Sequence, residues 1–209
     1  GSGLRVTVAR FYTPSGRCIQ KPYDKNYEYD IYERYAHGEM TSADSMKVDT
    51  TSLFYTVKGR RVYGGGGIMP DKFVPLDTTE YSDYYRNMIA SGNLHKYCLE
   101  FVDLNRGDLK AKYPVDDDFV KDFVVTDDMM KQLIERCEKD SIKYDEGQYR
   151  RSEKVLKMAV KANIASDLYG SKSFYKVSNP HDKSFRTALE LINDDKEYYR
   201  LLKEGGFKN

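Results

Sequence analysis

Apolar and polar residues alternate along the first stretch of the chain. One face carries Leu4, Val6 and Val8, and the other carries Arg5 and Thr7. A period of two residues is typical of a half-buried β-strand, so the pattern predicts a strand over residues 4–12. The next four residues are Thr13, Pro14, Ser15 and Gly16. Proline in second place and glycine in fourth favour a type I turn, which would end the strand.

The remainder of the first third is mixed. Residues 24–52 are polar and irregular, with a short helix predicted at about 31–37. The segment LFYTVKGRRVY at 53–63 has the pattern of a β-hairpin that turns at Lys58 and Gly59. KFVPL at 72–76 predicts one more short strand. We therefore expect a β-rich region over residues 1–77, with an insertion at about 21–52.

From about residue 78, apolar residues recur every three or four positions, which is the period of an amphipathic helix. The first two series are Tyr81, Tyr84, Tyr85, Met88 and Ile89, and then Leu94, Tyr97, Cys98, Phe101 and Val102. Gly92 is placed to end the first helix, and Asn93 is placed to cap the second.

Four further helices are predicted along the rest of the chain. The first carries Phe119 and Phe123, and the second runs from a Thr126 cap through Met130, Leu133, Ile134 and Cys137. The third covers about 149–169, with Gly170 as terminator and with Leu156, Val160, Ile164 and Leu168 facing inward. The last has an Asp182 cap, continues towards Leu202, and is predicted to bury Phe185, Ala188, Leu189 and Ile192. The fold class is therefore predicted to be α+β, with a helical domain over residues 78–209. A few strands followed only by helices leave sheet edges unpaired, so the β-rich region is expected to complete a larger sheet.

Composition narrows the class of protein. The chain has 209 residues, of which 40% are hydrophobic and 32% charged, and its formal net charge is +1. This balance predicts a folded protein and removes the usual electrostatic reason to expect nucleic acid or an anionic membrane as partner. The sequence contains no apolar run of about 20 residues, so no membrane span is expected. The 19 tyrosines and the methionines on predicted helix faces are interpreted as core or contact surface.

The three cysteines are Cys18, Cys98 and Cys137, which are widely separated and odd in number. They are interpreted as small buried groups, because no CxxC pair indicates a zinc site or a disulfide framework. His37, His95 and His181 are far apart, although His95 and Cys98 could share a helix face. Neither DLNRGD at 103–108 nor Asp116–Asp118 has the spacing of a calcium loop, and the second is interpreted as a helix start. No cofactor and no metal are expected.

Two further segments contain residues found in phosphate-binding loops or in nucleophilic catalysis. The glycines at 64–67 lack the GxxxxGK[ST] pattern of a phosphate-binding loop, and Pro70 has no amide to offer, so a flexible or closely packed backbone is predicted. Ser173 and Lys176 form a Ser-x-x-Lys pair, which on a helix could serve nucleophilic catalysis. SKSFYKVS is predicted to be extended, where the two side chains would point to opposite faces, so the match is interpreted as accidental.

The segments GSGLRVTVARFYTPSGRCIQ and GGGGIMPDKFVPL together resemble the end of the protease core in the C-terminal processing peptidases, also called tail-specific proteases. The matching positions are Leu4, Thr7, Ala9, Tyr12, Thr13, Pro14, Gly16, Arg17, Ile19, Gln20, Gly67, Ile68, Pro70 and Asp71. Residues 21–63 separate the two motif blocks by more than in compact members of the family. The resemblance covers about the first third of the chain, and the helical remainder looks like the C-terminal extension of longer members.

The resemblance implies a serine endopeptidase with a Ser/Lys dyad, a PDZ domain that captures the substrate's C-terminus, and a location in the cell envelope or periplasm. The family's serine, lysine and supporting glutamine precede the matched segment, so no catalytic residue is assigned here and this chain alone is expected to be inactive. Its motif residues Thr13, Pro14, Gly16, Arg17, Gln20, Gly67, Ile68, Pro70 and Asp71 are expected to be scaffold. Substrate would be bound through the missing part. The alternative is a non-enzymatic helical module that forms a homo-oligomer or holds an adaptor protein.

Overall fold

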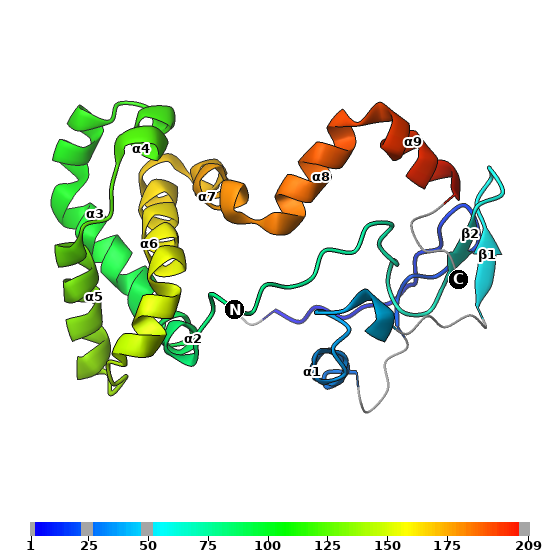
Figure 1. The fold of residues 1–209 in the computed structure, drawn as a ribbon, viewed down its shortest axis with the longest axis horizontal. Coiled ribbons are helices and arrows are strands. Elements are labelled where there is room, and N and C mark those ends of the chain that lie inside the picture. The colour runs from blue at the N-terminus through cyan, green and yellow to red at the C-terminus, as the bar shows by residue number, and fades with distance from the viewer. Residues whose placement is uncertain (1–2, 22–26, 47–51, 205–209) are drawn as a thin grey trace. The chain divides into compact units, whose positions relative to one another are not determined.

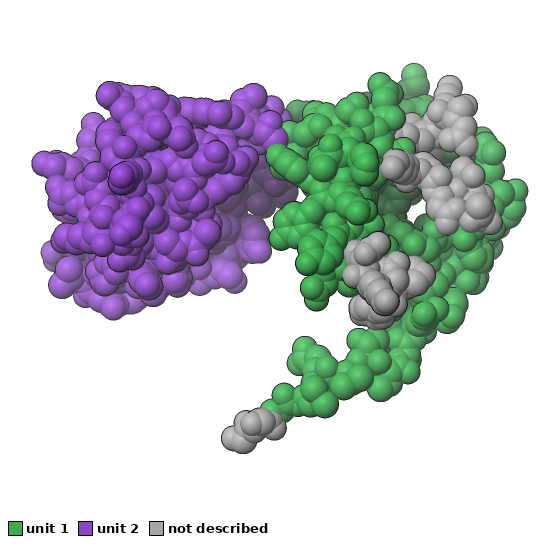
Figure 2. All heavy atoms as spheres, turned by 90° about the horizontal axis from the view of Figure 1, so that it is seen from below, with its two compact units in different colours: residues 1–76, 188–209 green, residues 77–187 purple. Residues whose placement is uncertain are grey.

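The computed structural model describes residues 3–21, 27–46 and 52–204. The chain divides into two compact units, coloured separately in Figure 2. Unit 1 consists of residues 1–76 and 188–209, and unit 2 consists of residues 77–187. In its described part the protein is mostly helical with a small two-stranded antiparallel sheet, which agrees with the predicted α+β class at this coarse level.

Unit 2 is a helical bundle built around its longest helix (Figure 1). Its elements are α2 Asp83–Ala90, α3 Asn93–Lys112, α4 Asp116–Asp122, α5 Asp127–Lys139, α6 Glu146–Tyr169, α7 Ser171–Ser178, the 3₁₀ helix η2 Asn179–His181, and the start of α8 Lys183–Asn193. α6 packs against α2, α3, α4 and α7, and α5 packs against α3. The core of unit 2 therefore surrounds α6.

Side-chain caps fix where several of these helices begin. The hydroxyl of Thr126 accepts a hydrogen bond from the Met129 amide at 3.2 Å, and a carboxylate oxygen of Asp182 accepts one from the Ser184 amide at 2.7 Å. Both caps were predicted, because a hydroxyl or carboxylate here satisfies an amide that has no partner within the helix. Gly92 and Gly170, with φ of 75° and 94°, separate neighbouring helices as predicted.

Asn93 has a different role from the predicted cap. Gly92 occupies the N-cap position of α3, and Asn93 is its first helical residue and is buried. The Asn93 amide donates to the Ser91 hydroxyl at 3.1 Å and accepts from Arg136 at 3.3 Å. Asn93 thus ties the α2–α3 turn to α5, which is a tertiary role that spacing along the chain does not reveal.

The apolar series of unit 2 meet in one continuous core. The four residues predicted to face inward on α6, Leu156, Val160, Ile164 and Leu168, are all buried. Phe119 has no exposed surface and stacks on Phe123, with the ring centroids 4.4 Å apart. Tyr113 meets both rings edge-on. Aromatic pairs of these geometries add to the free energy of burial.

The prediction of an extended segment at 171–178 is wrong, because these residues form α7. Gly170 ends α6 and allows the chain to reverse into a new helix. In α7, Ser173 and Val177 lie four residues apart, share one face and are buried. Packing of this face against α4 and α6 decides the conformation.

Unit 1 contains short elements joined by long connections. Its described elements are α1 Asp30–Ala36, the 3₁₀ helix η1 Ala43–Ser45, strands β1 Leu53–Tyr55 and β2 Arg61–Tyr63, the end of α8, and α9 Asp195–Glu204. The predicted hairpin and short helix are confirmed. β1 and β2 are antiparallel, with Phe54 opposite Val62. Gly59 has a φ of 79° in the connecting loop, a conformation that glycine adopts without strain.

The strands predicted at 4–12 and 72–76 are absent from the structure of the described residues. Residues 3–11 belong to no helix or strand and bond to no backbone group in the described ranges. Leu4 and Val8 are each 91% exposed. An alternating segment forms a strand only where another strand supplies hydrogen-bond partners, and the described part of this chain supplies none for it.

The last two helices also differ from the prediction. Phe185, Leu189 and Ile192 of α8 are exposed rather than buried, Ile192 to 63%. The helix ends at Asn193, and α9 begins at Asp195 and buries Leu201. Helical periodicity shows which residues share a face, but burial also requires a second surface against that face. In the portion of the chain that the structure covers, no helix is long and apolar enough to cross a membrane.

Candidate functional site

The two motif blocks of the resemblance lie side by side in unit 1. The amide of Gly65 donates to the carbonyl of Cys18 at 3.0 Å, and the amide of Gly67 donates to the carbonyl of Ile19 at 2.8 Å. The Arg17 guanidinium donates to the carbonyl of Tyr63 at 3.2 Å. Backbone hydrogen bonds therefore join segments that are separated by residues 21–63 in sequence.

The first block ends in a tight turn. The Gly16 amide donates to the Thr13 carbonyl at 2.8 Å, and the Thr13 amide donates to the Arg17 carbonyl at 2.9 Å. Gly16 has a φ of 80°, and Pro14 has no amide that the turn leaves unpaired. The predicted turn is thus present, and it brings Tyr12 into an isolated β-bridge with Cys18.

The glycine run packs closely against the first block. A Cβ on Gly64 would lie 3.0 Å from the Phe54 ring and 3.3 Å from the carbonyl oxygen of Cys18. Gly65 and Gly67 have φ values of 81° and 96°. Because their amides already bond to carbonyls of the first block, they are not available to a phosphate group. The run serves close backbone packing, which was one of the two structural roles predicted for it.

Asp71 and Pro70 follow the glycine run. The Asp71 carboxylate forms an ion pair with Arg60, which comes from the loop of the β1–β2 hairpin. Pro70 and Ile68 line a surface hollow together with Ile19 and Gln20 of the first block. The nine predicted scaffold residues thus divide among the turn, the hydrogen-bonded pairing, the Arg60 ion pair and the wall of this hollow.

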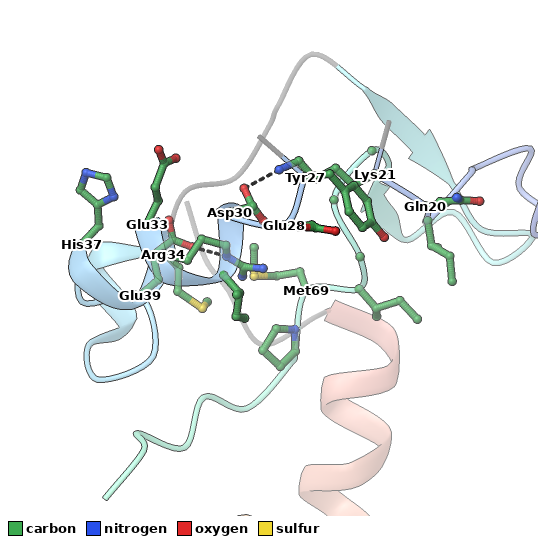
Figure 3. Close-up of a pocket in the computed structure, with 18 residues that line it drawn as sticks. Gln20, Lys21, Tyr27, Glu28, Asp30, Glu33, Arg34, His37, Glu39 and Met69 are labelled. Atoms are coloured by element: carbon green, nitrogen blue, oxygen red, sulfur yellow. Dashed lines mark hydrogen bonds and ion pairs between the residues drawn. The ribbon is translucent and has the colours of Figure 1, made fainter. Parts of the chain in front are cut away.

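The hollow lies between these segments and α1, and its volume is about 780 Å³ (Figure 3). Two ion pairs cross its polar side: Lys21 with Asp30 at 2.6 Å, and Arg34 with Glu39 at 2.9 Å. Glu39 is 7% exposed, so water has little access to its carboxylate. The ion pair with Arg34 compensates the charge of this buried group. Four charged side chains of this wall therefore neutralise one another in two ion pairs.

Catalytic geometry is absent from the described walls of the hollow. Figure 3 shows Gln20 and His37 on opposite sides of the view. No serine or threonine lines the hollow, so its described walls offer no aliphatic hydroxyl of the kind that a serine peptidase uses. Across residues 3–21, 27–46 and 52–204, no three His, Cys, Asp or Glu side chains form a group that could hold a metal ion.

Ser173 and Lys176 do share a helix face, contrary to prediction, but their contacts argue against catalysis. The Ser173 hydroxyl donates to Asp116 at 2.9 Å, and the Lys176 ammonium pairs with Asp116 at 2.9 Å and Asp117 at 2.6 Å. The bonds to Asp117 and Asp116 hold the pKa of Lys176 above its ordinary value. A lysine that must deprotonate serine needs the opposite shift, so this group ties α7 to α4 instead.

His95 and Cys98 lie near an acidic residue that the sequence analysis missed. His95 bonds to Asn163 at 3.3 Å, and burial raises the pKa of the Asp167 carboxyl, which His95 partly offsets. Burial raises the pKa of the Cys98 thiol to about 12. The thiol therefore stays protonated and cannot act as a nucleophile at neutral pH. Asp167 lies on the polar side of α6, and only the packing of α3 on α6 brings it to His95.

The remaining candidates are structural. Cys137 is fully buried, and burial raises the pKa of its thiol to about 11. Cys18 is partly buried, and none of the three cysteines forms a disulfide with a described residue. Residues 103–108 lie within α3 and form no loop that could surround calcium. Asp116–Asp118 form the first turn of α4, as predicted, where carboxylates favour the positive end of the helix dipole.

Comparison with known proteins gives one match. The family described as "Family of unknown function (DUF8443)" matches residues 84–170, which run from α2 to the end of α6 in unit 2. The match covers less than half of the chain and lies outside the motif blocks. No curated protein and no solved structure matches.

Proposed function

We propose that residues 1–77 form the C-terminal part of the protease core of a C-terminal processing peptidase, with residues 78–209 as a helical extension of that core. The whole enzyme would hydrolyse peptide bonds near protein C-termini with a Ser/Lys dyad and would act in the cell envelope or periplasm. The residues of this chain would serve as scaffold, because none of those described has the geometry of the dyad. Peptide substrates would reach the enzyme through its preceding part.

One observation carries this proposal. The two motif blocks, which resemble the family at 14 positions, are hydrogen-bonded to each other although residues 21–63 separate them in sequence. A scaffold built from both motif blocks requires them to lie together, and they do so in this chain. Their contact is backbone to backbone at Cys18 with Gly65 and Ile19 with Gly67, which is the kind of contact that a shared scaffold requires.

The leading segment supports the same proposal. Residues 3–11 alternate apolar and polar side chains, as a strand covered on one face does, yet Leu4, Val6 and Val8 are all exposed. Their backbone amides and carbonyls have no partner within the described residues. A neighbouring strand of a larger sheet would satisfy these groups and cover the apolar face.

The dyad lysine of this family must lose its proton near neutral pH, which desolvation favours by penalising the charged ammonium. The only Ser-x-x-Lys pair of this chain, Ser173 and Lys176, lies in a carboxylate environment that keeps the ammonium charged. The dyad is therefore assigned to polypeptide that precedes residue 3 in the whole enzyme.

The test uses a fluorophosphonate, which acylates activated serines irreversibly. This chain alone should show no labelling, whereas the protein encoded by the whole gene should take up about one label per chain. The label should be lost when the lysine of a Gly-Lys-Gly-x-x-Gln-type stretch upstream of residue 3 is replaced by alanine. Absence of such a lysine, or labelling of this chain by itself, would refute the proposal.

A second candidate is a non-enzymatic assembly module, favoured by the apolar face that α8 and α9 leave exposed. That face includes Leu189, Ile192 and Leu202. Light scattering coupled to size exclusion discriminates between the two functions. A stable oligomer that Ile192→Asp dissociates, together with an unlabelled whole protein, would favour the assembly module. A monomer would count against it.

A further inference from the structure

Unit 2 has a second hollow, which none of the features above uses. It lies between α6, the connection from α4 to α5, and the end of α7, and its volume is about 430 Å³. Its apolar wall includes Val124, Met158 and Val177. Val124 is 73% exposed, so the hollow opens to solvent.

The charged groups that line this hollow are all basic. Three lysines come from α6 and one from α7: Lys154, Lys157, Lys161 and Lys176. No aspartate or glutamate of the described residues lines it. Since the protein as a whole is nearly neutral, with a formal net charge of +1, this excess of one sign is local. It would attract negative charge to an apolar surface.

Two of the four ammoniums are already neutralised. Lys157 pairs with Asp127 at 2.7 Å and with Glu153 at 2.8 Å. Lys176 pairs with two aspartates of α4, as described above. These lysines are paired with carboxylates that are not among the residues lining the hollow, and they offer little net charge to a ligand.

The other two lysines, Lys154 and Lys161, have no carboxylate partner within the described part of the chain. The Lys161 ammonium donates to the backbone carbonyl of Val120 at 2.7 Å. Partial burial lowers its pKa, and Asp122 acts on it only through space. Lys154 is exposed and forms no ion pair with a described residue. Both ammoniums are therefore free to meet an incoming anion.

The spacing of these two lysines defines the shape of what they can bind. They lie seven residues apart on α6, so they share one face and their Cα atoms are separated by about 10 Å along the axis. Between them lie Met158 and the neutralised Lys157. A single carboxylate cannot reach both ends, and a bare phosphate backbone would leave the apolar wall uncovered.

We propose that this hollow binds a peptide segment of a partner protein in which an apolar side chain is flanked by acidic side chains on both sides. The apolar side chain contacts Val124, Met158 and Val177, and the acidic side chains reach Lys154 and Lys161. In an extended peptide, side chains two to four residues apart on one face are separated by about 7 to 13 Å, which spans the distance between the lysines. This inference does not rest on the proposed function.

The probe is an acetylated and amidated heptapeptide of sequence Asp-Asp-Ala-Leu-Ala-Asp-Asp, titrated into the full chain and followed by methyl NMR. The methyl signals of Val124, Met158 and Val177 should shift more than those of Leu133, which lies in the core. Replacing all four aspartates by asparagine, or the leucine by alanine, should weaken binding. Equal binding of the asparagine peptide would refute the proposal.

Variants of Lys154 and Lys161 test whether their ammonium groups contribute to peptide binding. Lys154→Gln and Lys161→Met should each weaken binding about threefold, and together about tenfold. Lys161→Arg keeps the charge and a donor for Val120, so it should retain affinity even if Lys161→Met disturbs the fold. Lys131→Gln is the matched control, because Lys131 is an exposed lysine of α5 outside the hollow.

Three results would overturn the proposal. The first is a Lys131→Gln effect as large as that of Lys154→Gln. The second is the absence of methyl shifts at the apolar wall when the peptide reaches millimolar concentration. The third is binding to phosphatidylglycerol vesicles through the same lysines with no response to the peptide, which would assign the hollow to a membrane surface instead.

Discussion

The two units of this protein are built from sequences of similar hydrophobicity, yet among the described residues only unit 2 shows a hydrophobic core. In unit 2, a continuous cluster of buried side chains extends from Tyr84 to Val177. In the described residues of unit 1, Leu201 is the single buried hydrophobic side chain. The difference teaches that apolar residues are necessary for a core but not sufficient, because each apolar face must also find another face to cover it.

The arrangement of elements explains this contrast. The helices of unit 2 are long enough to present apolar stripes on several sides of α6, so every stripe meets another. In the described part of residues 1–76, unit 1 has a seven-residue helix, a 3₁₀ turn and two strands of three residues, and an isolated two-stranded hairpin is marginal in water. Its other elements, the end of α8 and the ten-residue α9, bury one hydrophobic side chain, Leu201. Its exposed side chains, including Tyr29, Tyr32 and Phe11, are those expected of a region that is completed by other polypeptide.

The largest expected effect comes from truncating one phenylalanine in each unit. Phe119→Ala should lower the free energy of unfolding of unit 2 by about 3–5 kcal/mol, because it leaves a cavity among packed rings. Phe11→Ala should change stability by less than about 0.5 kcal/mol, since Phe11 is 89% exposed. Denaturant unfolding followed by circular dichroism measures both. Equal losses would mean that the two units do not differ as described.

The next effect concerns the one close packing contact of unit 1. Gly64→Ala places a Cβ against the Phe54 ring and the Cys18 carbonyl, and should cost about 1–3 kcal/mol locally. Hydrogen exchange of the Gly65 and Gly67 amides, which bond to the first motif block, should become faster. Gly66→Ala is the control, because nothing lies within 4 Å of its Cβ position. If both variants exchange alike, the contact between the motif blocks is not what orders this region.

A smaller effect concerns two buried tyrosines of unit 2. The Tyr84 hydroxyl is buried without a hydrogen-bond partner in the described structure, whereas the Tyr97 hydroxyl donates to Gln132 at 3.3 Å. Tyr84→Phe should therefore raise the unfolding free energy by about 1 kcal/mol, and Tyr97→Phe should lower it by about 0.5–1 kcal/mol. Thermal and urea unfolding of the two variants test the sign. A loss of stability in Tyr84→Phe would reveal a partner for that hydroxyl.

The smallest effect is a dependence on pH in the tie between α4 and α7. The hydrogen bonds from Lys176 and Ser173 lower the pKa of Asp116 below its ordinary value. A carboxyl with a lowered pKa in the folded state stabilises above its unfolded pKa of about 3.9, and this contribution is lost as the pH falls through the folded value. Asp116→Asn should therefore lower the Tm at pH 7 and have little effect at pH 2.

Asp118→Asn provides the control for this measurement. It removes a carboxylate from the same helix turn without removing a bond to Lys176. At pH 7 it should lower the Tm less than Asp116→Asn does. The interpretation of Asp116 as a tie between helices would be wrong if the two variants lowered the Tm equally.

Local signals predicted where elements begin and end more reliably than which surfaces they bury. Thr126, Asp182, Gly59 and Gly170 act over a few residues, through a cap or a backbone conformation that is largely independent of the rest of the fold. His95 and Cys98 lie three residues apart on α3 and so share a helix face, as the sequence predicts. Their neighbour Asp167 could not be found, because it lies on another helix.

The errors share a physical cause. The strand over 4–12 needed a neighbour that the described chain does not supply, and the apolar face of α8 needed a covering surface. SKSFYKVS lacks a clear periodicity, and packing of Ser173 and Val177 against α4 and α6 selected the helix. In each case the deciding interaction came from residues distant in sequence.

The amino-acid sequence alone determined the hairpin, the helices from α2 to α6, the caps at Thr126 and Asp182 and the turn at 13–16, and it contains the motif blocks that resemble a protease scaffold. These features depend on interactions within one or two turns of chain. Only the tertiary structure decided that the motif blocks pair, that Lys176 is held by two aspartates, and that Lys154 and Lys161 share an open hollow. Such contacts join residues that no local pattern relates, because their free energy arises only when separate surfaces meet.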